Sequence, residues 1–321
     1  MVASLMALAT CLGCKLLIFR TIDSKEVFRQ AYFNTKEFKT FYSLTGIIPP
    51  SVRNATKLLN FGLSGNRING NIPKEIEGEI PLFITNASKL EILELQNNFI
   101  TGTISNNLEN LRELQELFLY NNQLTNEPRE HDFQFFNSLE DCRMLQYLQA
   151  GSNPLNGFLP NSIGNLSFTI VNIHMEDAHI SDFIPASTGN MSDLTALIFH
   201  ENNLTGSIPS EIGKLKHLQG LSLSNNKLQG HIPEIVCSLS NLVALDIDNN
   251  EFSGSIPECL GNLSKLQEFF LISNRSLSSK FPSSLWKMSG YVSQNSIEGE
   301  VPQDIGGLKA ILELDLSSNN F

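Results

Sequence analysis

The chain has 321 residues, and its 22 Lys and Arg against 33 Asp and Glu give a formal net charge of −11. This balance argues against a nucleic-acid binder, because a surface that tracks phosphates needs clustered Lys and Arg. Hydrophobic residues make up 41% and charged residues 17%, so the chain can fold around a core and is not a disordered acidic tail. The five cysteines are too few and too scattered for a disulfide scaffold (Cys11, Cys14, Cys142, Cys237 and Cys259).

Residues 1–43 precede the regular part of the chain, and we expect a leader or an irregular N-terminal segment there. The apolar start from Met1 to Phe19 is broken by Lys15, and its stretch from Val2 to Cys14 partly fits a signal peptide, although no basic residue precedes it. A working signal and a spurious or structural leader both remain open. No other stretch approaches the roughly 20 uninterrupted apolar residues of a membrane span, so we expect no transmembrane helix in this chain.

Residues 44–321 repeat one motif, L-x-x-L-x-L-x-x-N-x-L-x-G-x-I-P. Three successive copies start at Leu194, Leu218 and Leu242, with a spacing of 24 residues each time. About ten repeat units, or rungs, are recognisable. The further ones start at Leu58, Leu90, Leu114, Leu145, Ile170 and Leu266, near Lys287 and at Ile311. Self-similarity at such a period is the signature of a solenoid, in which each repeat forms one turn of a coil.

The L-x-L alternation predicts one short strand per rung with its apolar side chains inward, and such a strand cannot cover them alone. Stacked rungs would pair their strands at about 4.8 Å. We predict an α/β repeat solenoid, curved, with a concave parallel β-sheet and short 3-10 or loop segments on the convex side. In one rung, Ala178 stands where the motif has Asn, and Asp182 stands where it has Gly. We expect a weaker turn in this rung but no break in the solenoid. The Asn after each strand should bond backbone groups of adjacent turns in an internal ladder (Asn66, Asn98, Asn122, Asn153, Asn202, Asn226, Asn250 and Asn274).

Two places depart from the period. The Ile72-Pro73 tail is followed eight residues later by Ile80-Pro81, as if a rung had lost its strand, and the rung from Leu266 to Lys287 is short. A degraded gene, an alternative transcript or an imperfect gene model would explain this, and ordinary loop variation is the alternative. The last rung stops at Phe321, so we expect a C-terminally truncated solenoid.

The outward strand positions form an acidic and polar concave face with isolated aromatic residues. Carboxylates cluster within four rungs, Glu251 among them, and aromatic side chains flank them on both sides. We hypothesise that an extended basic peptide or basic protein segment binds here, presenting cations to the acids and apolar side chains to the rings. Simple solvation is the alternative for any single polar residue. The candidate ligand-binding residues are Phe118, Tyr120, Tyr147, His174, Glu176, Asp177, His200, Glu201, Asp246, Asp248 and Phe270.

Three histidines, His174, His179 and His200, sit among these acids. A metal site from His174, Glu176 and His200 is conceivable, but adjacent columns diverge outward and no closed shell of ligands is evident. We therefore expect no metal and no other cofactor. Proximity of His200 to Glu176 would favour the charged imidazole and an acid-sensitive site, and ordinary surface histidines are the simpler alternative.

Seven N-x-S/T sequons are candidate glycosylation sites (Asn54, Asn86, Asn165, Asn190, Asn203, Asn262 and Asn274). Asn165 and Asn262 are predicted on outer turns, where a glycan would leave the concave sheet open. This placement favours a secretory origin. Cys237 and Cys259 lie on the outer side of neighbouring rungs, but their positions within the repeat differ by two residues. We therefore expect free buried thiols in preference to a bridge.

Catalytic signatures are absent from the sequence. It has no kinase G-x-G-x-x-G loop, H-R-D or D-F-G, and neither a P-loop nor a G-x-S-x-G elbow. The Cys11-x-x-Cys14 pair has redox spacing but lacks a strand–helix context, so it is interpreted as apolar filler. We do not expect an enzyme.

The G-x-I-P tails resemble plant extracellular leucine-rich repeats. The insertion from Asp132 to Cys142, followed by the Gly157 to Ser167 segment, is similar to the ectodomains of plant immune receptor kinases, the subfamily that includes sensors of flagellin and elongation-factor peptides. The resemblance implies non-catalytic recognition of a peptide or protein ligand, in defence or development, by a secreted or cell-surface module. A complete relative would add a membrane span and a Ser/Thr kinase and would pair with a leucine-rich repeat co-receptor kinase. A secreted protein that binds or inhibits an extracellular enzyme, and a non-functional fragment of a receptor kinase gene, are the alternatives.

Overall fold

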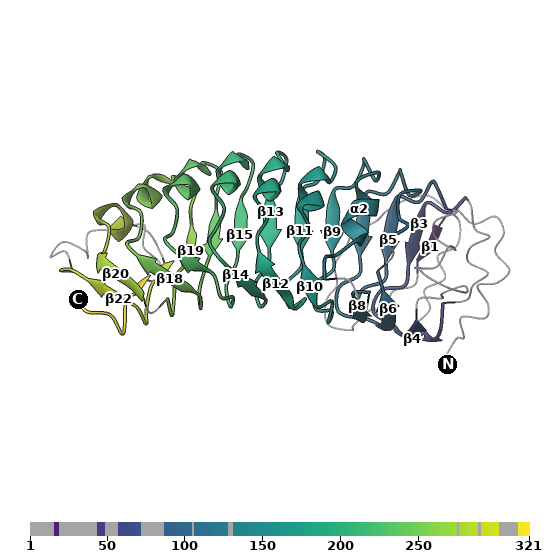
Figure 1. Ribbon diagram of the computed structural model, residues 1–321, viewed down its shortest axis with the longest axis horizontal. Coiled ribbons are helices and arrows are strands. Elements are labelled where there is room, and N and C mark those ends of the chain that lie inside the picture. Colours follow the sequence, from purple (N-terminus) through teal and green to yellow (C-terminus); the bar gives the residue numbers. More distant parts are fainter. Residues whose placement is uncertain are drawn as a thin grey trace.

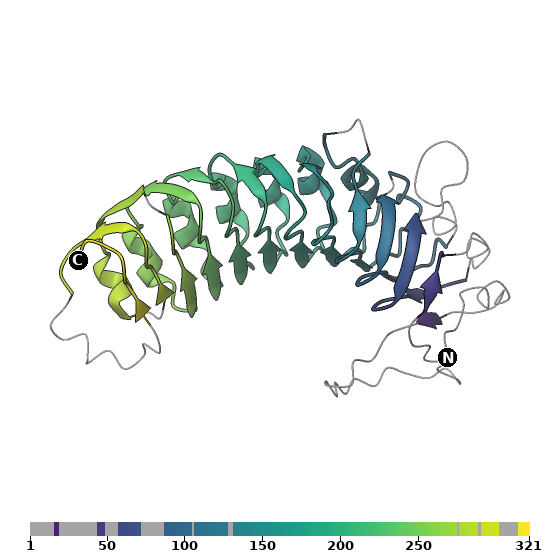
Figure 2. The same ribbon diagram turned by 90° about the horizontal axis from the view of Figure 1, so that it is seen from below.

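The computed structural model describes residues 16–18, 44–48, 57–71, 87–104, 106–127, 131–274, 276–287, 290–301 and 314–321. These residues wind into a curved coil, with strands and short helices recurring from rung to rung (Figures 1 and 2). The predicted solenoid is therefore confirmed. Within the described ranges, every helix is too short or too polar to cross a lipid bilayer.

One strand per rung joins the main sheet, in which all pairs are parallel and the spatial order follows the chain order. β1 lies within residues 1–43 and pairs with β3, so the sheet begins ahead of the range expected for the solenoid. The described strands are β1 (Leu16–Ile18), β3 (Asn60–Gly62), β5 (Ile92–Glu94), β7 (Glu116–Phe118), β9 (Tyr147–Gln149), β11 (Asn172–His174), β13 (Ala196–Ile198), β15 (Gly220–Ser222), β17 (Ala244–Asp246), β19 (Glu268–Phe270), β21 (Gly290–Tyr291) and β23 (Leu314–Asp315).

From Pro160 onward, the proline that ends a repeat precedes a 3-10 helix on the other side of the coil in six described rungs. The proline before η5 (Ser210–Lys214) is extended, with φ −67°, and the proline before η6 (Glu234–Ser238) has φ −75°. Proline suits this position because its fixed φ and missing N–H cost nothing where a helix begins. The remaining 3-10 helices are η3 (Asn161–Asn165), η4 (Ala186–Asn190), η7 (Glu258–Asn262) and η8 (Ser283–Lys287).

The segments after the ladder asparagines form further short parallel sheets, which the sequence analysis missed. Asn203-Leu204-Thr205 alternates polar and apolar residues, as a half-buried strand does. Gly206 then turns the chain at φ +72°, in the left-handed region that glycine adopts without strain. These strands are β2 (Thr45–Gly46), β4 (Arg67–Asn71), β6 (Phe99–Thr103), β8 (Gln123–Thr125), β10 (Gly157–Phe158), β12 (Ile180–Phe183), β14 (Asn203–Thr205), β16 (Gln229–Gly230), β18 (Glu251–Gly254), β20 (Ser276–Lys280) and β22 (Ser296–Glu298).

The long rung from Leu114 adds a helix, α2 (Phe135–Leu139), to the coil. Phe135 and Phe136 stack with ring centroids 4.6 Å apart, and Phe133 is buried beside them. Cys142 closes this insertion as a buried free thiol. Burial, assisted by the nearby carboxylates of Asp141 and Glu109, raises the pKa of this thiol to about 12, so it is an inert part of the core.

The asparagine ladder is confirmed, and Asn226 shows how it works. Its Oδ1 accepts from the Leu204 N–H of the preceding rung at 2.9 Å. Its Nδ2 donates to the carbonyl oxygens of Phe199 on that rung and of Leu223 and Ser224 on its own. One side chain thus satisfies four buried backbone groups that the strand ladder leaves unpaired. The same pattern includes Asn295, which keeps the short rung after Leu266 in the stack.

The rung with Ala178 interrupts the ladder without breaking the sheet, as predicted. β9, β11 and β13 pair without a gap. The Leu155 N–H, which an asparagine at position 178 would bind, instead donates to the carbonyl of Asn153 in its own turn. Asp182, in the glycine slot, adopts φ +68°, a conformation that costs a non-glycine residue about 1 kcal/mol.

The prediction of free thiols at Cys237 and Cys259 is wrong, because the two form a disulfide with Cα atoms 5.8 Å apart. Their separation of 22 residues looked out of phase with a period of 24. On this side of the coil, however, residues that touch across neighbouring rungs are separated by fewer positions in the sequence than the repeat length. A Cβ built on Gly213 would meet Ile235, and one on Gly189 would meet Glu211, both 22 positions on.

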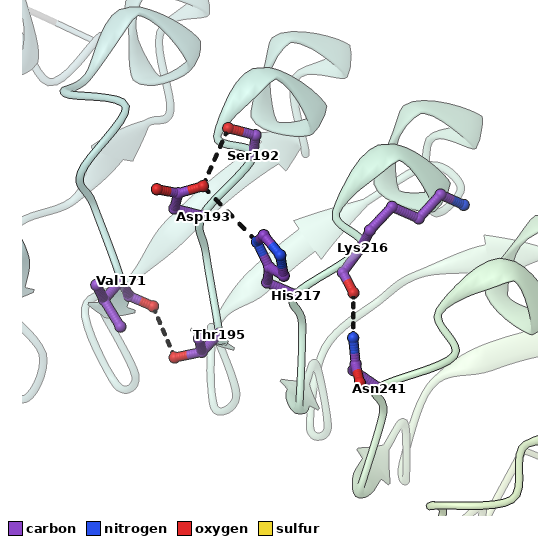
Figure 3. A network of polar contacts seen from close by, with 7 residues as sticks. All are labelled: Val171, Ser192, Asp193, Thr195, Lys216, His217 and Asn241. Carbon is purple, nitrogen blue, oxygen red and sulfur yellow. Dashed lines mark hydrogen bonds and ion pairs between the residues drawn. The ribbon is translucent and has the colours of Figure 1, made fainter.

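Polar contacts also connect the loops that lead from the 3-10 helices to the main strands (Figure 3). Thr195 donates its hydroxyl to the Val171 carbonyl at 3.1 Å, and Asn241 donates to the Lys216 carbonyl at 2.7 Å. Asp193 and His217 approach to 3.7 Å with both side chains more than half exposed. Such an exposed pair contributes little to stability, so the ladder and the core hold the rungs together.

Several sequence predictions fall outside the described residues. They are the signal peptide, the Cys11-x-x-Cys14 pair, the two closely spaced tails at Ile72-Pro73 and Ile80-Pro81, and the sequons at Asn54 and Asn86.

Replacing Asn226 with alanine should lower the free energy of unfolding by about 2–4 kcal/mol, because buried backbone groups on two rungs lose their partner. Chemical denaturation measures this loss. Asn225→Gly is the matched control, since Asn225 is exposed and has φ +53°, which glycine adopts freely. A similar loss in both variants would contradict the role of the ladder.

Candidate ligand-binding face

The strand register aligns the candidate residues in rows across the main sheet. Phe118 pairs with Gln149, and Gln149 pairs with His174. Further along the same row, Asp246 pairs with Phe270, which pairs with Tyr291. The residues predicted between the two core positions of each strand therefore share one face and one line.

A second column, immediately before the ladder positions, is left-handed in every described rung. Gly65 has φ +67° there, and the ten non-glycine residues of the column have φ between +47° and +58° (Asn97, Asn121, Ser152, Asp177, Glu201, Asn225, Asn249, Ser273, Gln294 and Ser318). Asn and Asp tolerate this conformation better than other non-glycine residues. The turn therefore accounts for most of the polar character of the column, including Asp177. The turn does not account for Glu201, because Glu adopts the left-handed conformation less readily than Asn or Asp.

Two of the candidate acids are engaged within the sheet. The Asp246 carboxylate accepts hydrogen bonds from the hydroxyls of Ser222 and Ser224 at 2.9 and 2.7 Å. Asp248 accepts from the backbone N–H of Ile272. Burial raises the pKa of Asp248 to about 7 against the opposing effect of that hydrogen bond, and the nearby Asp246 raises it further. Asp248 therefore offers a ligand less charge than the sequence indicates, and part of the hydrogen-bonding capacity of Asp246 is already used.

Glu176 differs from both, because its side chain lies over the bare backbone of the neighbouring rung. A Cβ built on Gly151 would stand 2.8 Å from Glu176 Oε2, so only glycine leaves room for this carboxylate. The Oε2 atom is buried and has no hydrogen-bond partner among the described residues. An unpaired buried carboxylate oxygen is costly, and a cation bound beside the carboxylate would offset part of that cost.

Two histidines stand close to Glu176. Desolvation lowers the pKa of His174, Glu176 opposes this shift, and His200 adds to it. His200 Nδ1 lies 3.4 Å from the Ser222 hydroxyl. Across the described ranges, no three His, Cys, Asp or Glu side chains are arranged to hold a metal ion.

Aromatic pairs lie on both sides of the acids. Phe118 and Tyr147 meet edge to face at 6.5 Å, and the Tyr120 hydroxyl accepts a hydrogen bond from Asn97 at 3.2 Å. Phe270 stacks on Tyr291 at 5.2 Å, with their planes 9° apart. Sequence reasoning missed Tyr291 because its rung is irregular. The pairing of Phe270 with the following rung was the only available signal.

Other candidate residues lie away from this face. Glu251 is on β18, paired with Gln229 in a lateral sheet, so its inclusion among the concave acids is wrong. Asn274 is fully buried and belongs to the ladder, donating to the Ile247 carbonyl at 3.0 Å, so a glycan there is incompatible with the fold. The remaining described sequon asparagines are exposed (Asn165, Asn190, Asn203 and Asn262).

Asp248 should make stability depend on pH. Its pKa in the folded state, about 7, lies above that of an unfolded Asp, about 3.9. The folded protein therefore retains a proton that the unfolded chain has lost, and the free energy of unfolding falls as pH rises from about 4 to about 7. Because the side chain is partly solvated, we expect a loss of about 1–2 kcal/mol.

Denaturation at a series of pH values tests this expectation. Asp248→Asn should flatten the decline, whereas Asp177→Asn, an exposed change on the same face, should leave it in place. Equal slopes for Asp248→Asn and the unmodified protein would refute the assignment.

Glu201→Asn should increase the free energy of unfolding by about 0.5–1 kcal/mol, because asparagine adopts the left-handed turn more readily than glutamate. Asn225 and Asn249 already occupy the equivalent slot in the next two rungs. Calorimetry or denaturant titration measures the gain. A loss of stability would mean that Glu201 has a structural partner and is not a spare surface charge.

Comparison with known proteins agrees with this geometry. A family model described as a leucine-rich repeat region matches residues 201–290, and a leucine-rich repeat model matches 89–111 and 144–166. The LRR receptor-like serine/threonine-protein kinase EFR of Arabidopsis thaliana is 38% identical over 87 residues, which are 27% of this chain and 8% of that protein. This chain thus corresponds to a small part of that curated relative.

Solved structures of plant receptors match over a longer stretch. The plant peptide hormone receptor RGFR1 in complex with RGF2 has 26% identity and a TM-score of 0.68, covering 87% of this chain and 46% of that one. The Arabidopsis receptor kinase HAESA, in complex with the peptide hormone IDA and the co-receptor SERK1, has 28% identity and a TM-score of 0.61, covering 87% and 53%. The chain is therefore a plant-type leucine-rich repeat solenoid that is similar, over part of its length, to plant leucine-rich repeat receptor kinases.

Proposed function

We propose that this chain is a non-catalytic extracellular recognition module whose concave face binds an extended peptide or protein segment carrying a cationic side chain. The observation that carries the proposal is the Glu176 carboxylate, which lies over Gly151 with a buried oxygen that no described residue pairs. A Lys or Arg of the ligand, bound beside this carboxylate, would supply a compensating charge. The similar receptors RGFR1 and HAESA are peptide-bound in their structures, which supports a ligand of this class.

The aromatic pairs set the length of the proposed site. From β7, which carries Phe118, to β21, which carries Tyr291, the sheet advances by seven strand spacings. At about 4.8 Å each, this distance is about 34 Å, which about ten residues of extended chain would span. The rings at both ends would take apolar side chains, because such contacts add most to affinity when they exclude water.

The proposed contact set remains the one predicted from the sequence, with unequal roles. Glu176 is its centre, and Glu201 and Asp177 add exposed negative charge nearby. Asp246 and Asp248 mainly hold the sheet. The complete set is Phe118, Tyr120, Tyr147, His174, Glu176, Asp177, His200, Glu201, Asp246, Asp248 and Phe270.

The location and partners of the chain form part of the same proposal. The Cys237–Cys259 disulfide is typical of an oxidising compartment, and exposed sequons suit passage through the secretory pathway. HAESA is solved with its co-receptor SERK1, so we propose a leucine-rich repeat co-receptor kinase as a second partner. The similarity to the receptor-like kinase EFR supports a receptor-like role at the cell surface, which we propose serves plant defence or developmental signalling.

A library of random peptides of about 12 residues, displayed on phage and panned against the secreted protein, tests the ligand class. We expect enrichment of sequences with a Lys or Arg between apolar residues. A synthetic copy of an enriched peptide should bind Glu176→Gln at least about tenfold more weakly, since a desolvated charged hydrogen bond is lost.

Glu234→Gln is the matched control, because it removes the same charge from an exposed position on η6, on the opposite side of the coil. Its affinity should stay unchanged. Enrichment without cationic residues, or equal affinities for Glu176→Gln and the unmodified protein, would reject the proposed site. A requirement for a large folded partner would favour an enzyme-binding role.

A further inference from the structure

A second concave site lies on a lateral sheet, away from the proposed peptide face. It is a wide-open cavity of about 460 Å³ over β10, β12 and β14, lined among others by His131, Asn156, Phe158, His179, Ser181 and Asn203. This volume falls within the range of pockets that hold small ligands. None of the residues proposed to bind the peptide lines it.

The strand register places three of these residues in one line. Phe158 pairs with Ser181, and Ser181 pairs with Asn203. Register partners on parallel strands point to the same side of a sheet, at about 4.8 Å per strand. The backbone of Phe158 therefore lies about 10 Å from that of Asn203 across the floor of the cavity.

The lining has the chemistry that binds a saccharide. Phe158 and His131 stack with centroids 5.8 Å apart and planes 20° apart, which gives a broad flat wall. His179 and Asn156 are joined at 3.1 Å and form a polar wall. Hexose rings present a face of C–H groups, which packs on aromatic rings, and hydroxyl and amide groups at their edges, which bond to polar side chains.

Asn203 begins the sequon Asn203-Leu204-Thr205, and its surroundings differ from those of the other exposed sequons. The neighbouring Asn202 takes the ladder position, and the side chain of Asn203 is exposed at the rim of the cavity. Asn165, by contrast, lies in η3 and donates to Glu140 at 2.9 Å. Asn190 and Asn262 lie at the ends of 3-10 helices, far from this sheet.

We propose that Asn203 carries an N-linked glycan whose innermost sugars fold back over Ser181 and occupy this cavity against Phe158. In the modification, the Asn203 Nδ2–C1 bond forms while the C1–O bond to the diphosphate of a lipid-linked oligosaccharide breaks, and the amide proton is lost to base. The inference rests on passage through the secretory pathway and not on the peptide site.

The position of the cavity gives the glycan a structural role. His179 and Ser181 belong to the rung in which Ala178 interrupts the ladder, and Asp182 in the same rung is left-handed. Sugars that span β10, β12 and β14 would connect this rung to both neighbours. The glycan thereby supports the stack where the asparagine hydrogen bonds are missing.

The full chain, secreted from a eukaryotic host behind a host signal peptide, tests the inference. Mass spectrometry should find Asn203 glycosylated. Thr205→Val, which abolishes the sequon and keeps a β-branched residue, should lower the Tm by about 2 °C or more. In a Phe158→Leu background, which removes the ring, the same change should have no further effect.

A second variant, Ser181→Tyr, fills the centre of the cavity and should make the Asn203 glycan at least tenfold more accessible to an amidase that cleaves the Asn–sugar bond. The glycan at Asn190, removed by Ser192→Ala, is the internal control, and its effect should not depend on Phe158. An unmodified Asn203, additive effects of Thr205→Val and Phe158→Leu, or unchanged amidase access in Ser181→Tyr would each overturn the inference. Peptide binding by the same samples reports separately on the concave face.

Discussion

The structure depends on one recurring interaction, the hydrogen bonding of a buried asparagine side chain to backbone groups of two successive rungs. A short parallel strand pairs only part of the backbone N–H and C=O groups of its rung. The chain must then turn sharply to leave the main sheet. The residue before each ladder position supplies that turn by adopting a left-handed conformation, as Asn225 does before Asn226. Turn and ladder therefore form one unit, and repetition of this unit stacks the rungs into a sheet with a continuous, solvent-facing wall.

This unit also limits which exposed residues of the concave face count as evidence for a ligand site. A polar residue in the left-handed column satisfies the turn, so Asp177 or Asn249 alone is weak evidence for a ligand. Asp246 is likewise occupied by the two serines beside it. Glu176 is unlike them, because a glycine on the neighbouring rung makes room for its carboxylate and no described group completes its hydrogen bonds. The case for a binding face rests on such residues, which the fold itself does not need.

Much of the fold could be predicted from the sequence, because period, strand and ladder asparagine are encoded in each repeat. The lateral sheets were missed, since their strands are too short to give more than two or three alternations, as at Gln229–Gly230. The Cys237–Cys259 bridge was misjudged because the offset between outer turns depends on three-dimensional stacking and not on the repeat length. The candidate site was predicted from the sequence as columns of outward-facing residues across the strands. The sequence did not reveal which acids are already hydrogen-bonded or which one lies over a glycine backbone, because both depend on neighbours in adjacent rungs.

Amide hydrogen exchange in the free protein, resolved by residue, tests the central role of the ladder most directly. The Leu204 and Leu228 N–H groups lie outside the main strands but donate to ladder asparagines, at 2.9 and 3.0 Å. They should exchange as slowly as the strand amides of β13 and β15 in the unmodified protein, and the Leu204 N–H should exchange much faster in Asn226→Ala, which removes its acceptor. Fast exchange at Leu204 and Leu228 in the unmodified protein, or unchanged protection of Leu204 in Asn226→Ala, would contradict the account.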